Sequence, residues 1–431
     1  MSFEEMWADL LPIGRDPDSG GYHRFAWTPP ELECRAWFVD EARKRDLEIE
    51  TDANGNLFAW WLPADSSRGD AVLTGSHLDS VPGGGAYDGP LGIVSAFAAI
   101  DLLRERRVQL ARPIGVAAFA EEEGARFGVA CLGSRLLSGA IAPYRARGLR
   151  DRDGHAFADV LTRHGLDPER IGPDDDLLGR IGCHVELHIE QGRALDVPVG
   201  VASAIVPHGR WRFGFTGEGN HAGTTHLKDR RDPMLPFAHL VLAARQAAER
   251  HGTLTTVGKV EVTPNGVNAI ASSVTAWLDG RGPADDAVRR TVAEIHEAAQ
   301  KAAREHGVTV DLAEESYSEV VGFDTTLRDR LAETLARSEN AAQPSGPEPS
   351  GGPGSVRVLP TGAGHDAGIL ASRLPTAMLF VRNPTGISHA PAEHADRDDC
   401  LAGVEALTIA LEELAGGLEE PAAGLKAPAA G

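Results

Sequence analysis

Histidine and acidic side chains that suit metal binding recur at five places along the chain, most of them beside a short apolar run. The first place is the segment 76–80, which contains His77 and Asp79. On extended backbone these two side chains point to the same side, because side chains alternate. A histidine held by a nearby carboxylate is a common metal-ligand arrangement. An isolated pair of this kind is more often an ordinary surface pair, so its meaning depends on the other four places.

A glycine-rich segment, residues 83–92, contains the second candidate, Asp88. The segment opens a predicted helix, but it lacks the lysine and the glycine spacing of a phosphate-binding loop. Its glycines instead allow the backbone to turn around one carboxylate, whose two oxygens can bridge two cations. The alternative is that Asp88 caps the helix N-terminus. The residues alone leave both roles open.

Three adjacent glutamates, Glu121, Glu122 and Glu123, follow another apolar run. Adjacent carboxylates repel one another unless cations lie nearby. One of them can bind a metal while its neighbour acts as a base. The alternative is a solvated helix N-terminus, which favours acidic residues.

The last two candidates are His188, inside the apolar run 185–189, and His389, after the apolar run 376–381. A lone histidine within such a run is more often a buried core residue. All five places together supply three histidines and at least two carboxylates near predicted strand ends, where α/β sheets bind ligands. This mixture of nitrogen and oxygen ligands suits Zn²⁺ or Mn²⁺, so we expect a metal site.

The composition excludes several other classes of protein. The chain has 431 residues and a net charge of −21, and no Lys/Arg cluster predicts nucleic-acid binding. Its four cysteines are widely spaced, which argues against a thiolate zinc site and a disulfide framework. The N-terminus does not resemble a signal peptide, and no apolar run is long enough to span a bilayer. We therefore expect a cytoplasmic protein with no membrane partner.

The elements that must position these side chains alternate between strands and helices. Strands are predicted at 47–50, 57–62, 71–74, 114–120, 185–189 and 376–381, and helices at 28–45 and 91–104. This alternation predicts an α/β domain with a central, mostly parallel sheet flanked by helices.

The middle of the chain has a different pattern. Strands at 211–215, 255–262, 274–278 and 308–313 and helices at 232–250 and 284–306 give the order β-α-β-β-α-β. That order predicts a small two-layer domain inserted into the large one. We expect a catalytic domain at 1–208 and 320–415, an inserted domain at 209–319 and a disordered tail at 416–431. The low-complexity segment 343–355 is predicted to be a mobile loop.

Seven motifs, taken in order, resemble one family of enzymes. They are HLDSVPGGGAYDGPLG, EEGARFG, HIEQG, GNHAGTT, PNGVNAI, GAGHDA and GISHAPAE. They resemble the hydantoinase/carbamoylase family of amidases, which includes allantoate amidohydrolases, N-carbamoyl-L-amino-acid hydrolases and β-ureidopropionases. That family belongs to the aminoacylase-like dimetal peptidase superfamily. The resemblance covers residues 20–415 approximately, and it implies that the inserted domain is a lid and dimerisation domain.

The resemblance implies a role for each matching residue. His77, Asp88 and His188 would hold one metal ion, and Asp88, Glu123 and His389 would hold a second, with Asp88 bridging. Glu122 would be the general base, and Asp79 would orient His77. The substrate-contacting positions would be Gln191, Asn268, Arg281, His365 and His221, the last supplied by the neighbouring subunit of a homodimer.

Three departures from the family pattern lie in the predicted inserted domain. His226 stands where the family has proline, Ala271 follows Ile270 where the family has proline, and Gly280 precedes Arg281 where the family has isoleucine. They leave the metal-ligand set intact and leave the identity of the substrate open.

The resemblance implies hydrolysis of the ureido C–N bond of a small N-carbamoyl acid, with release of ammonia and CO2. Allantoate and N-carbamoyl-L-amino acids both remain as substrates, with a slight preference for allantoate. One alternative is an aminoacylase or dipeptidase that acts on acyl amides. Another is a catalytically inactive, metal-free binding protein, against which the retained base Glu122 argues. Comparing carbamoyl with acyl substrates, and testing chelator sensitivity, distinguishes these possibilities.

Overall fold

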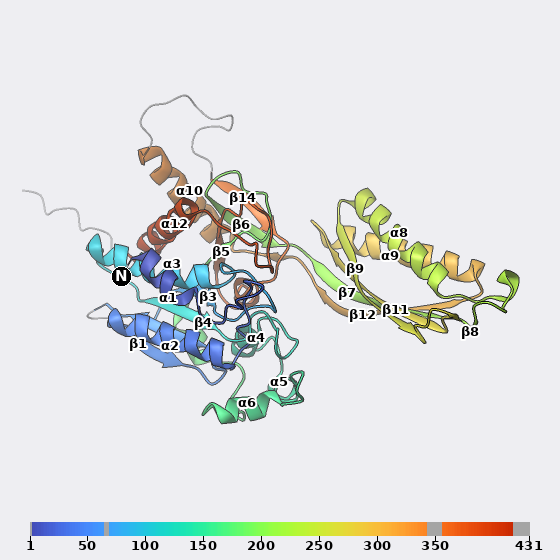
Figure 1. Cartoon of the computed structure of the whole chain (residues 1–431). Coiled ribbons are helices and arrows are strands. Elements are labelled where there is room, and N and C mark those ends of the chain that lie inside the picture. The colour runs from blue at the N-terminus through green and yellow to red at the C-terminus, as the bar shows by residue number, and fades with distance from the viewer. Residues whose placement is uncertain (1, 64–68, 343–355, 417–431) are drawn as a thin grey trace, which may run out of the picture. The chain divides into compact units, whose positions relative to one another are not determined.

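The computed structural model describes residues 2–63, 69–342 and 356–416, with side chains omitted for 339–342. The chain divides into two compact units, one formed by residues 1–203 and 322–431 and the other by residues 204–321 (Figure 1). The predicted loop at 343–355, and the predicted tail apart from Gly416, lie outside the described residues. None of the described helices has the length and apolar character needed to cross a membrane.

A large mixed sheet forms the centre of the first unit. Its described strands are β1 (Glu48–Thr51), β2 (Leu57–Trp61), β3 (Ala71–His77), β4 (Ile114–Phe119), β5 (Ile181–Ile189), β6 (Val199–Ile205), β13 (Val321–Gly322), β14 (Arg357–Thr361) and β15 (Thr376–Val381). They lie in the order β1-β2-β4-β3-β5-β15-β6-β13, and β14 also pairs with β6. The four central strands β4, β3, β5 and β15 are parallel, whereas β1, β2 and β6 pair antiparallel. The predicted mostly parallel sheet is therefore confirmed.

Helices bury both faces of this sheet, which explains why β3, β4 and β15 are buried along their whole length. The helices α1 (Phe3–Leu10), α2 (Pro29–Lys44), α3 (Pro90–Glu105), α10 (Thr325–Ala342) and α12 (Arg397–Ala415) share one hydrophobic core with it. The short helices α4 (Leu132–Ser138), α7 (Asp175–Leu178) and α11 (Asp366–Leu370) lie against the other face. Two further short helices, α5 (Pro143–Arg147) and α6 (Phe157–Arg163), belong to a satellite core.

The sequence pattern predicts no helix or strand in the segment between β4 and β5. Its helices α4 to α7 have four to seven residues each. A helix of one or two turns is too short to establish a 3.6-residue hydrophobic period, so the pattern gives no signal there.

The second unit is a two-layer sandwich. Its main elements follow one another as β7 (His208–Thr216), α8 (Met234–His251), β9 (Leu254–Thr263), β11 (Ser273–Arg281), α9 (Asp285–Glu305) and β12 (Thr309–Ser318). The four strands form an antiparallel sheet in the order β12-β7-β11-β9, and α8 and α9 pack together over one face. A short ladder of β8 (Asn220–His221) and β10 (Ala269–Ile270) lies beside it. Along β11 buried and half-buried residues alternate, as a sheet with one covered face requires.

A buried ion-pair network at the end of α2 yields a stability prediction. The Arg45 guanidinium is 4% exposed and bonds the Glu41 and Asp101 carboxylates at 2.6 Å each, joining α2 to α3. Arg45→Ala should cost about 3 kcal/mol of unfolding free energy, because it removes both of these ion pairs and leaves the buried Glu41 carboxylate to the half-exposed Lys44. The matched control is Arg43→Ala on the same helix, whose exposed side chain pairs with Asp40, and it should cost less than about 0.5 kcal/mol. Urea denaturation followed by circular dichroism measures both, and equal midpoints would contradict the prediction.

Candidate metal centre

Four segments that carry candidate ligands converge at one edge of the central sheet. His77 is the last residue of β3, and His188 is the penultimate residue of β5. The glutamates 121–123 follow β4, and His389 follows β15. Because β4, β3, β5 and β15 are parallel neighbours, their carboxyl ends meet, as in other α/β sheets that bind ligands there.

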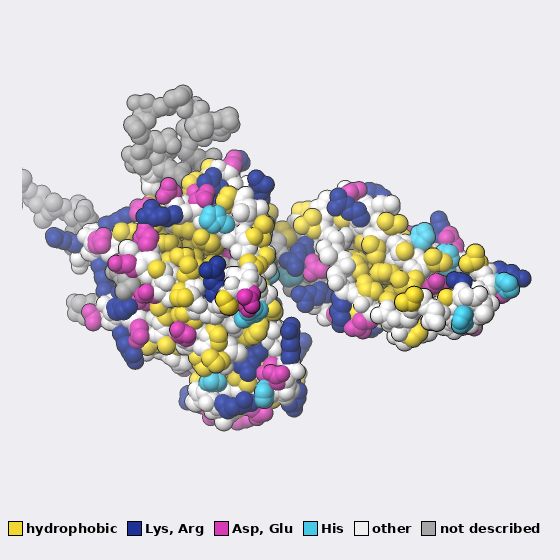
Figure 2. Space-filling model, viewed as in Figure 1, with side chains coloured by type: hydrophobic (Ala, Val, Ile, Leu, Met, Phe, Trp, Pro, Cys, Tyr) yellow, Lys and Arg dark blue, Asp and Glu magenta, His cyan; other side chains and the backbone are white. Residues whose placement is uncertain are grey.

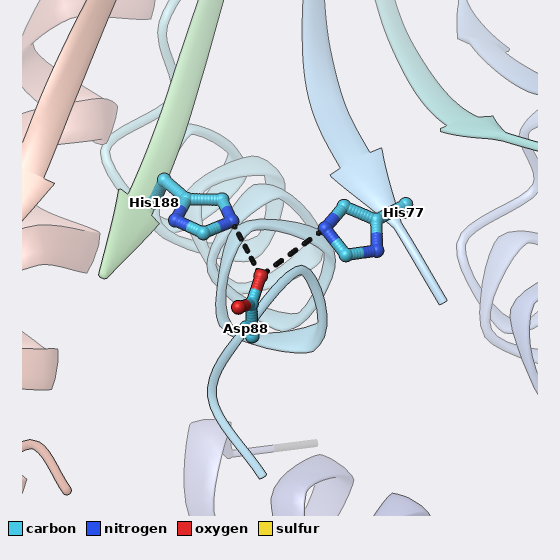
Figure 3. Close-up of side chains that lie close together, drawn as sticks. All are labelled: His77, Asp88 and His188. Carbon is cyan, nitrogen blue, oxygen red and sulfur yellow. Dashed lines mark ion pairs between the residues drawn. The ribbon is translucent and has the colours of Figure 1, made fainter. Parts of the chain in front are cut away.

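The first ligand group consists of two imidazoles facing one carboxylate oxygen (Figure 3). The Asp88 Oδ1 atom lies 3.4 Å from His77 Nε2 and 3.2 Å from His188 Nε2. All three side chains are buried, and their ligand atoms lie within 4.8 Å of one another.

The hydrogen bonds of the two imidazoles show that this group fits a cation. His77 Nδ1 is 3.1 Å from the Asp79 carbonyl oxygen, and His188 Nδ1 is 2.9 Å from the Ile189 carbonyl oxygen. Each Nδ1 therefore carries the proton, and each Nε2 directs a lone pair at the Asp88 oxygen. His77 Nε2 has no hydrogen-bond partner among the described residues. His188 Nε2 accepts the Gly89 N–H at 3.2 Å. The two Nε2 atoms and Asp88 Oδ1 are thus three buried acceptors that face one another, which is costly unless positive charge lies among them.

The second ligand group uses the other oxygen of the same carboxylate. His389 Nε2 lies 3.3 Å from Asp88 Oδ2 and 3.6 Å from Glu123 Oε2. The Gln191 amide nitrogen donates to Asp88 Oδ2 at 2.7 Å and lies 3.2 Å from His389 Nε2. The partial positive charge of its N–H groups therefore lies between the two acceptors, where a cation would also be stable. The His389 side chain is 50% exposed. The second group is thus the more open of the two, and Asp88 is common to both.

Glycines bring Asp88 to this position. Gly89 has a φ of +82°, and a Cβ there would lie 2.5 Å from the His77 ring. A Cβ at Gly92 would lie 2.3 Å from the Leu187 carbonyl oxygen, so only glycine lets the first turn of α3 approach β5 this closely. The helix N-cap is Gly89 and not Asp88, whose carboxylate is thereby left for the imidazoles.

Glu393 holds the same segment from a distant part of the chain, and sequence reasoning gave it no role. Its buried Oε1 accepts hydrogen bonds from the backbone N–H groups of Tyr87 and Asp88, at 3.0 Å each. The residue ends the motif GISHAPAE, in which only the histidine was predicted to have a role. That position was the only signal that could have identified it.

The three glutamates form a turn and not a helix N-terminus, since α4 begins only at Leu132. Asp79 fixes the turn, because its carboxylate accepts the N–H groups of Glu122 and Glu123 at 3.2 and 3.1 Å. The Glu121 carboxylate turns inward and accepts the backbone N–H of Phe127. The alternative of a solvated helix terminus is therefore wrong.

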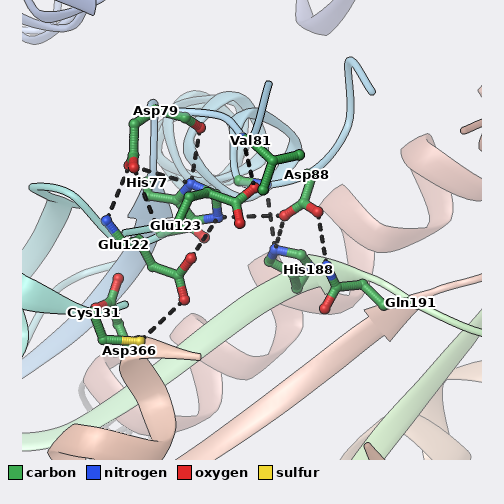
Figure 4. A network of polar contacts seen from close by, with 12 residues as sticks. His77, Asp79, Val81, Asp88, Glu122, Glu123, Cys131, His188, Gln191 and Asp366 are labelled. Carbon is green, nitrogen blue, oxygen red and sulfur yellow. Dashed lines mark hydrogen bonds and ion pairs between the residues drawn. The ribbon is translucent and has the colours of Figure 1, made fainter. Parts of the chain in front are cut away.

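The Glu122 carboxylate lies beside the first ligand group, as Figure 4 shows. Its Oε2 is 3.6 Å from His77 Nε2, and the residue is buried. Burial raises the pKa of Glu122 well above the usual range of a glutamate, against the opposing influence of His77. A raised pKa favours a carboxyl group that accepts a proton and returns it. Glu123 differs, since its Oε1 accepts the Val81 N–H while its Oε2 faces His389.

The predicted substrate residues fall into two sets. Gln191 contacts Asp88, and the His365 ring centroid is 4.5 Å from that of His188, so both lie at the ligand groups. The other three belong to the second unit. There His221 and Asn268 are neighbours, because the Ala222 N–H donates to the Asn268 carbonyl, while Arg281 ends β11 and pairs with Asp279 at 2.9 Å. His221 and Asn268 therefore lie toward the start of β11, whereas Arg281 lies at its other end.

The first unit is an α/β domain in which one carboxylate, that of Asp88, is shared between two candidate cation positions at a sheet edge. The sequence matches Peptidase family M20/M25/M40 over residues 73–413. It is 35% identical to an N-carbamoyl-L-amino acid amidohydrolase of Geobacillus stearothermophilus and 34% identical to an allantoate amidohydrolase of Escherichia coli (strain K12). Each alignment covers 96% of this chain and 98% of the relative.

Solved structures agree with this assignment. A hydantoinase/carbamoylase family amidase from Burkholderia ambifaria superimposes with a TM-score of 0.81 at 29% identity, over 96% of this chain and 97% of that one. The chain belongs to the M20/M25/M40 peptidase family and, within it, to the hydantoinase/carbamoylase amidases. The resemblance drawn from the seven motifs is thereby confirmed.

The geometry predicts how metal binding responds to substitution. The chelator-stripped chain should bind about two Mn²⁺ or Zn²⁺ ions, as sites with a shared carboxylate do. Asp88→Ala should weaken both ions, whereas His389→Ala should weaken only one, because His389 belongs to the second group alone. Isothermal titration calorimetry and metal analysis measure these stoichiometries.

The control lies outside the site. Asp151, Asp153 and His155 form another cluster of potential ligand atoms, but Asp151 already pairs with Arg126. His155→Ala should therefore leave both ions in place. A chain that binds neither metal at saturating concentration, or a His155→Ala variant that loses one, would contradict this description.

Proposed function

We propose that the chain is a two-metal amidohydrolase that cleaves the ureido C–N bond of a small N-carbamoyl acid. The observation that carries the proposal is the shared Asp88 carboxylate with Glu122 beside it. The named relatives are amidohydrolases, which act on C–N bonds other than peptide bonds, and two of them are named for N-carbamoyl-L-amino acids and allantoate. The reaction would release ammonia and CO2 after the carbamate product breaks down.

Five side chains would hold the metal ions. His77 and His188 would hold one ion and Glu123 and His389 the other, with Asp88 between them. Their nitrogen and oxygen donors suit zinc or manganese. When bound, such ions polarise a carbonyl group and lower the pKa of water.

Glu122 would move the proton. Its Oε2 faces His77, so it is placed to take a proton from the attacking water and to return it to the leaving nitrogen. Asp79 would keep this geometry, because it holds both the His77 ring and the turn that carries Glu122.

Substrate recognition would use the five residues that the family resemblance implies. Gln191 Oε1 and His365 Nε2 are buried and have no hydrogen-bond partner among the described residues, so each can bind a polar substrate group. Arg281 offers a planar guanidinium suited to a carboxylate, and Asp279 already orients it, so a substrate carboxylate would compete with Asp279 for this fork. His221 and Asn268 would add further hydrogen bonds.

We further propose a homodimer formed through the second unit. Its strand β9 is an edge strand, and the neighbouring helix α8 exposes Leu235 and Leu242 at 46% and 63%. Figure 2 shows apolar side chains gathered on this unit. An open edge and an apolar helix face suit pairing about a two-fold axis. In such a dimer His221 would reach the site of the partner subunit and stabilise the developing negative oxygen.

The cytoplasm is the proposed location. All four cysteines, Cys34, Cys131, Cys183 and Cys400, are free, as in proteins of a reducing compartment.

A substrate panel tests the reaction. With added Mn²⁺ or Zn²⁺, the chain should release ammonia from N-carbamoyl-L-amino acids or from allantoate, and a chelator should abolish the activity. N-acetyl amino acids and dipeptides are the matched acyl controls and should react far more slowly. Faster cleavage of the acyl substrates would instead make the chain an aminoacylase or dipeptidase, and no activity on any substrate would favour a binding protein.

The base assignment predicts a split between catalysis and metal binding. Glu122→Gln should lower kcat by about 10²–10⁴-fold, the usual contribution of a general base. Metal stoichiometry should stay unchanged, because Glu122 belongs to neither ligand group. Loss of an ion in this variant would mean that Glu122 and Glu123 exchange roles, and full activity would exclude Glu122 as the base.

Complementation tests the dimer. Glu122→Gln and His221→Ala should each be nearly inactive, but a mixed dimer contains one site with an intact Glu122 and an intact partner His221. Subunit exchange in an equal mixture should then restore about a quarter of wild-type activity, since about half of the dimers are mixed and each has one good site in two. If His221 acts within its own subunit, mixing restores nothing.

A further inference from the structure

We propose that Cys131 is a positioning residue for Glu122, and that its thiol selects which carboxylate oxygen receives the proton. The inference rests on the proposed function, in which Glu122 is the base. Cys131 is the N-cap residue of α4 and is only 3% exposed. Its Sγ lies 3.2 Å from Glu122 Oε1 (Figure 4). Its backbone N–H donates to the Glu122 carbonyl at 2.5 Å. One residue thus holds Glu122 by both its side chain and its backbone.

The backbone of Cys131 is one that glycine adopts more readily. Its φ is +54°, in the left-handed region that β-carbon-bearing residues occupy at a cost. A cysteine in this conformation gives up backbone stability that glycine would keep, so its side chain is the feature to explain. Burial raises the pKa of the Cys131 thiol well above its usual range, and the group stays a protonated donor.

A second contact fixes Cys131 itself. The Ser134 hydroxyl lies 3.2 Å from the Cys131 carbonyl oxygen and 2.5 Å from Asp366 Oδ1. Asp366 begins α11, directly after His365. The first turn of α4 is therefore tied to α11 on one side and to Glu122 on the other, which leaves the thiol little freedom to turn away.

The thiol makes the two oxygens of Glu122 unequal. Oε1 accepts the S–H group, whereas Oε2 lies 3.6 Å from His77 Nε2 and faces the first ligand group. Without the thiol the carboxylate can rotate, and Oε2 spends less time in the position that accepts the proton. The substitution replaces no metal ligand and no proposed substrate residue, so kcat should fall while KM and metal affinity hold.

Three substitutions separate this role from a structural one. Cys131→Gly removes the donor but suits the left-handed backbone, so its melting temperature should equal or exceed that of wild type. Cys131→Ala removes the donor and keeps the strain. Both should lower kcat about tenfold, the size of one hydrogen bond to a charged group, with KM and metal stoichiometry unchanged. Cys131→Ser keeps an O–H donor and should stay within about threefold of wild type.

Cys34→Ala is the matched control, because Cys34 is a fully buried free cysteine of α2 in the core. It should lower the melting temperature and leave kcat unchanged. Wild-type kcat in Cys131→Gly, or a kcat that follows melting temperature across the set, would overturn the inference. Should the wild type cleave acyl amides and no ureido compound, the proposed substrate is wrong, and the same comparison on the acyl substrate still decides the role of Cys131.

Discussion

A single buried carboxylate, that of Asp88, stands between three imidazoles, and the arrangement of the large unit depends on it. Its Oδ1 faces His77 and His188, and its Oδ2 faces His389. The two inner histidines donate their Nδ1 protons to carbonyl oxygens and so offer only lone pairs to the carboxylate. Acceptors gathered in this way in a buried place are costly without positive charge, so this group of side chains suits a cation.

The rest of the large unit meets that constraint through position and rigidity. Two of the histidines lie at the ends of parallel strands at one sheet edge, and helices cover both faces of the sheet. Asp79 ties the His77 ring to the turn that carries Glu122, and Glu393 ties the glycine-rich segment from the far end of the chain. Cys131 then holds Glu122 itself. Each of these side chains restrains a group that would otherwise be free to move away from the shared carboxylate.

The sequence predicted the class of the fold from its long strands, and the family resemblance of its ordered motifs implied the ligand set His77, Asp88, Glu123, His188 and His389. It did not predict Glu393 or Cys131. Glu393 bonds Asp88, which lies 305 residues away in the sequence, and the contact of Cys131 with Glu122 depends on a left-handed backbone at Cys131. Neither feature produces a local sequence pattern.

Electron paramagnetic resonance of the Mn²⁺-loaded chain shows whether the Asp88 carboxylate serves two cations. Two Mn²⁺ ions bridged by Asp88 are exchange-coupled, so we expect a multiline spectrum of a coupled pair that collapses to isolated-ion signals in Asp88→Ala. His155→Ala should leave the coupled spectrum intact. A wild-type spectrum of isolated Mn²⁺ at full occupancy, unchanged by Asp88→Ala, would contradict the shared site.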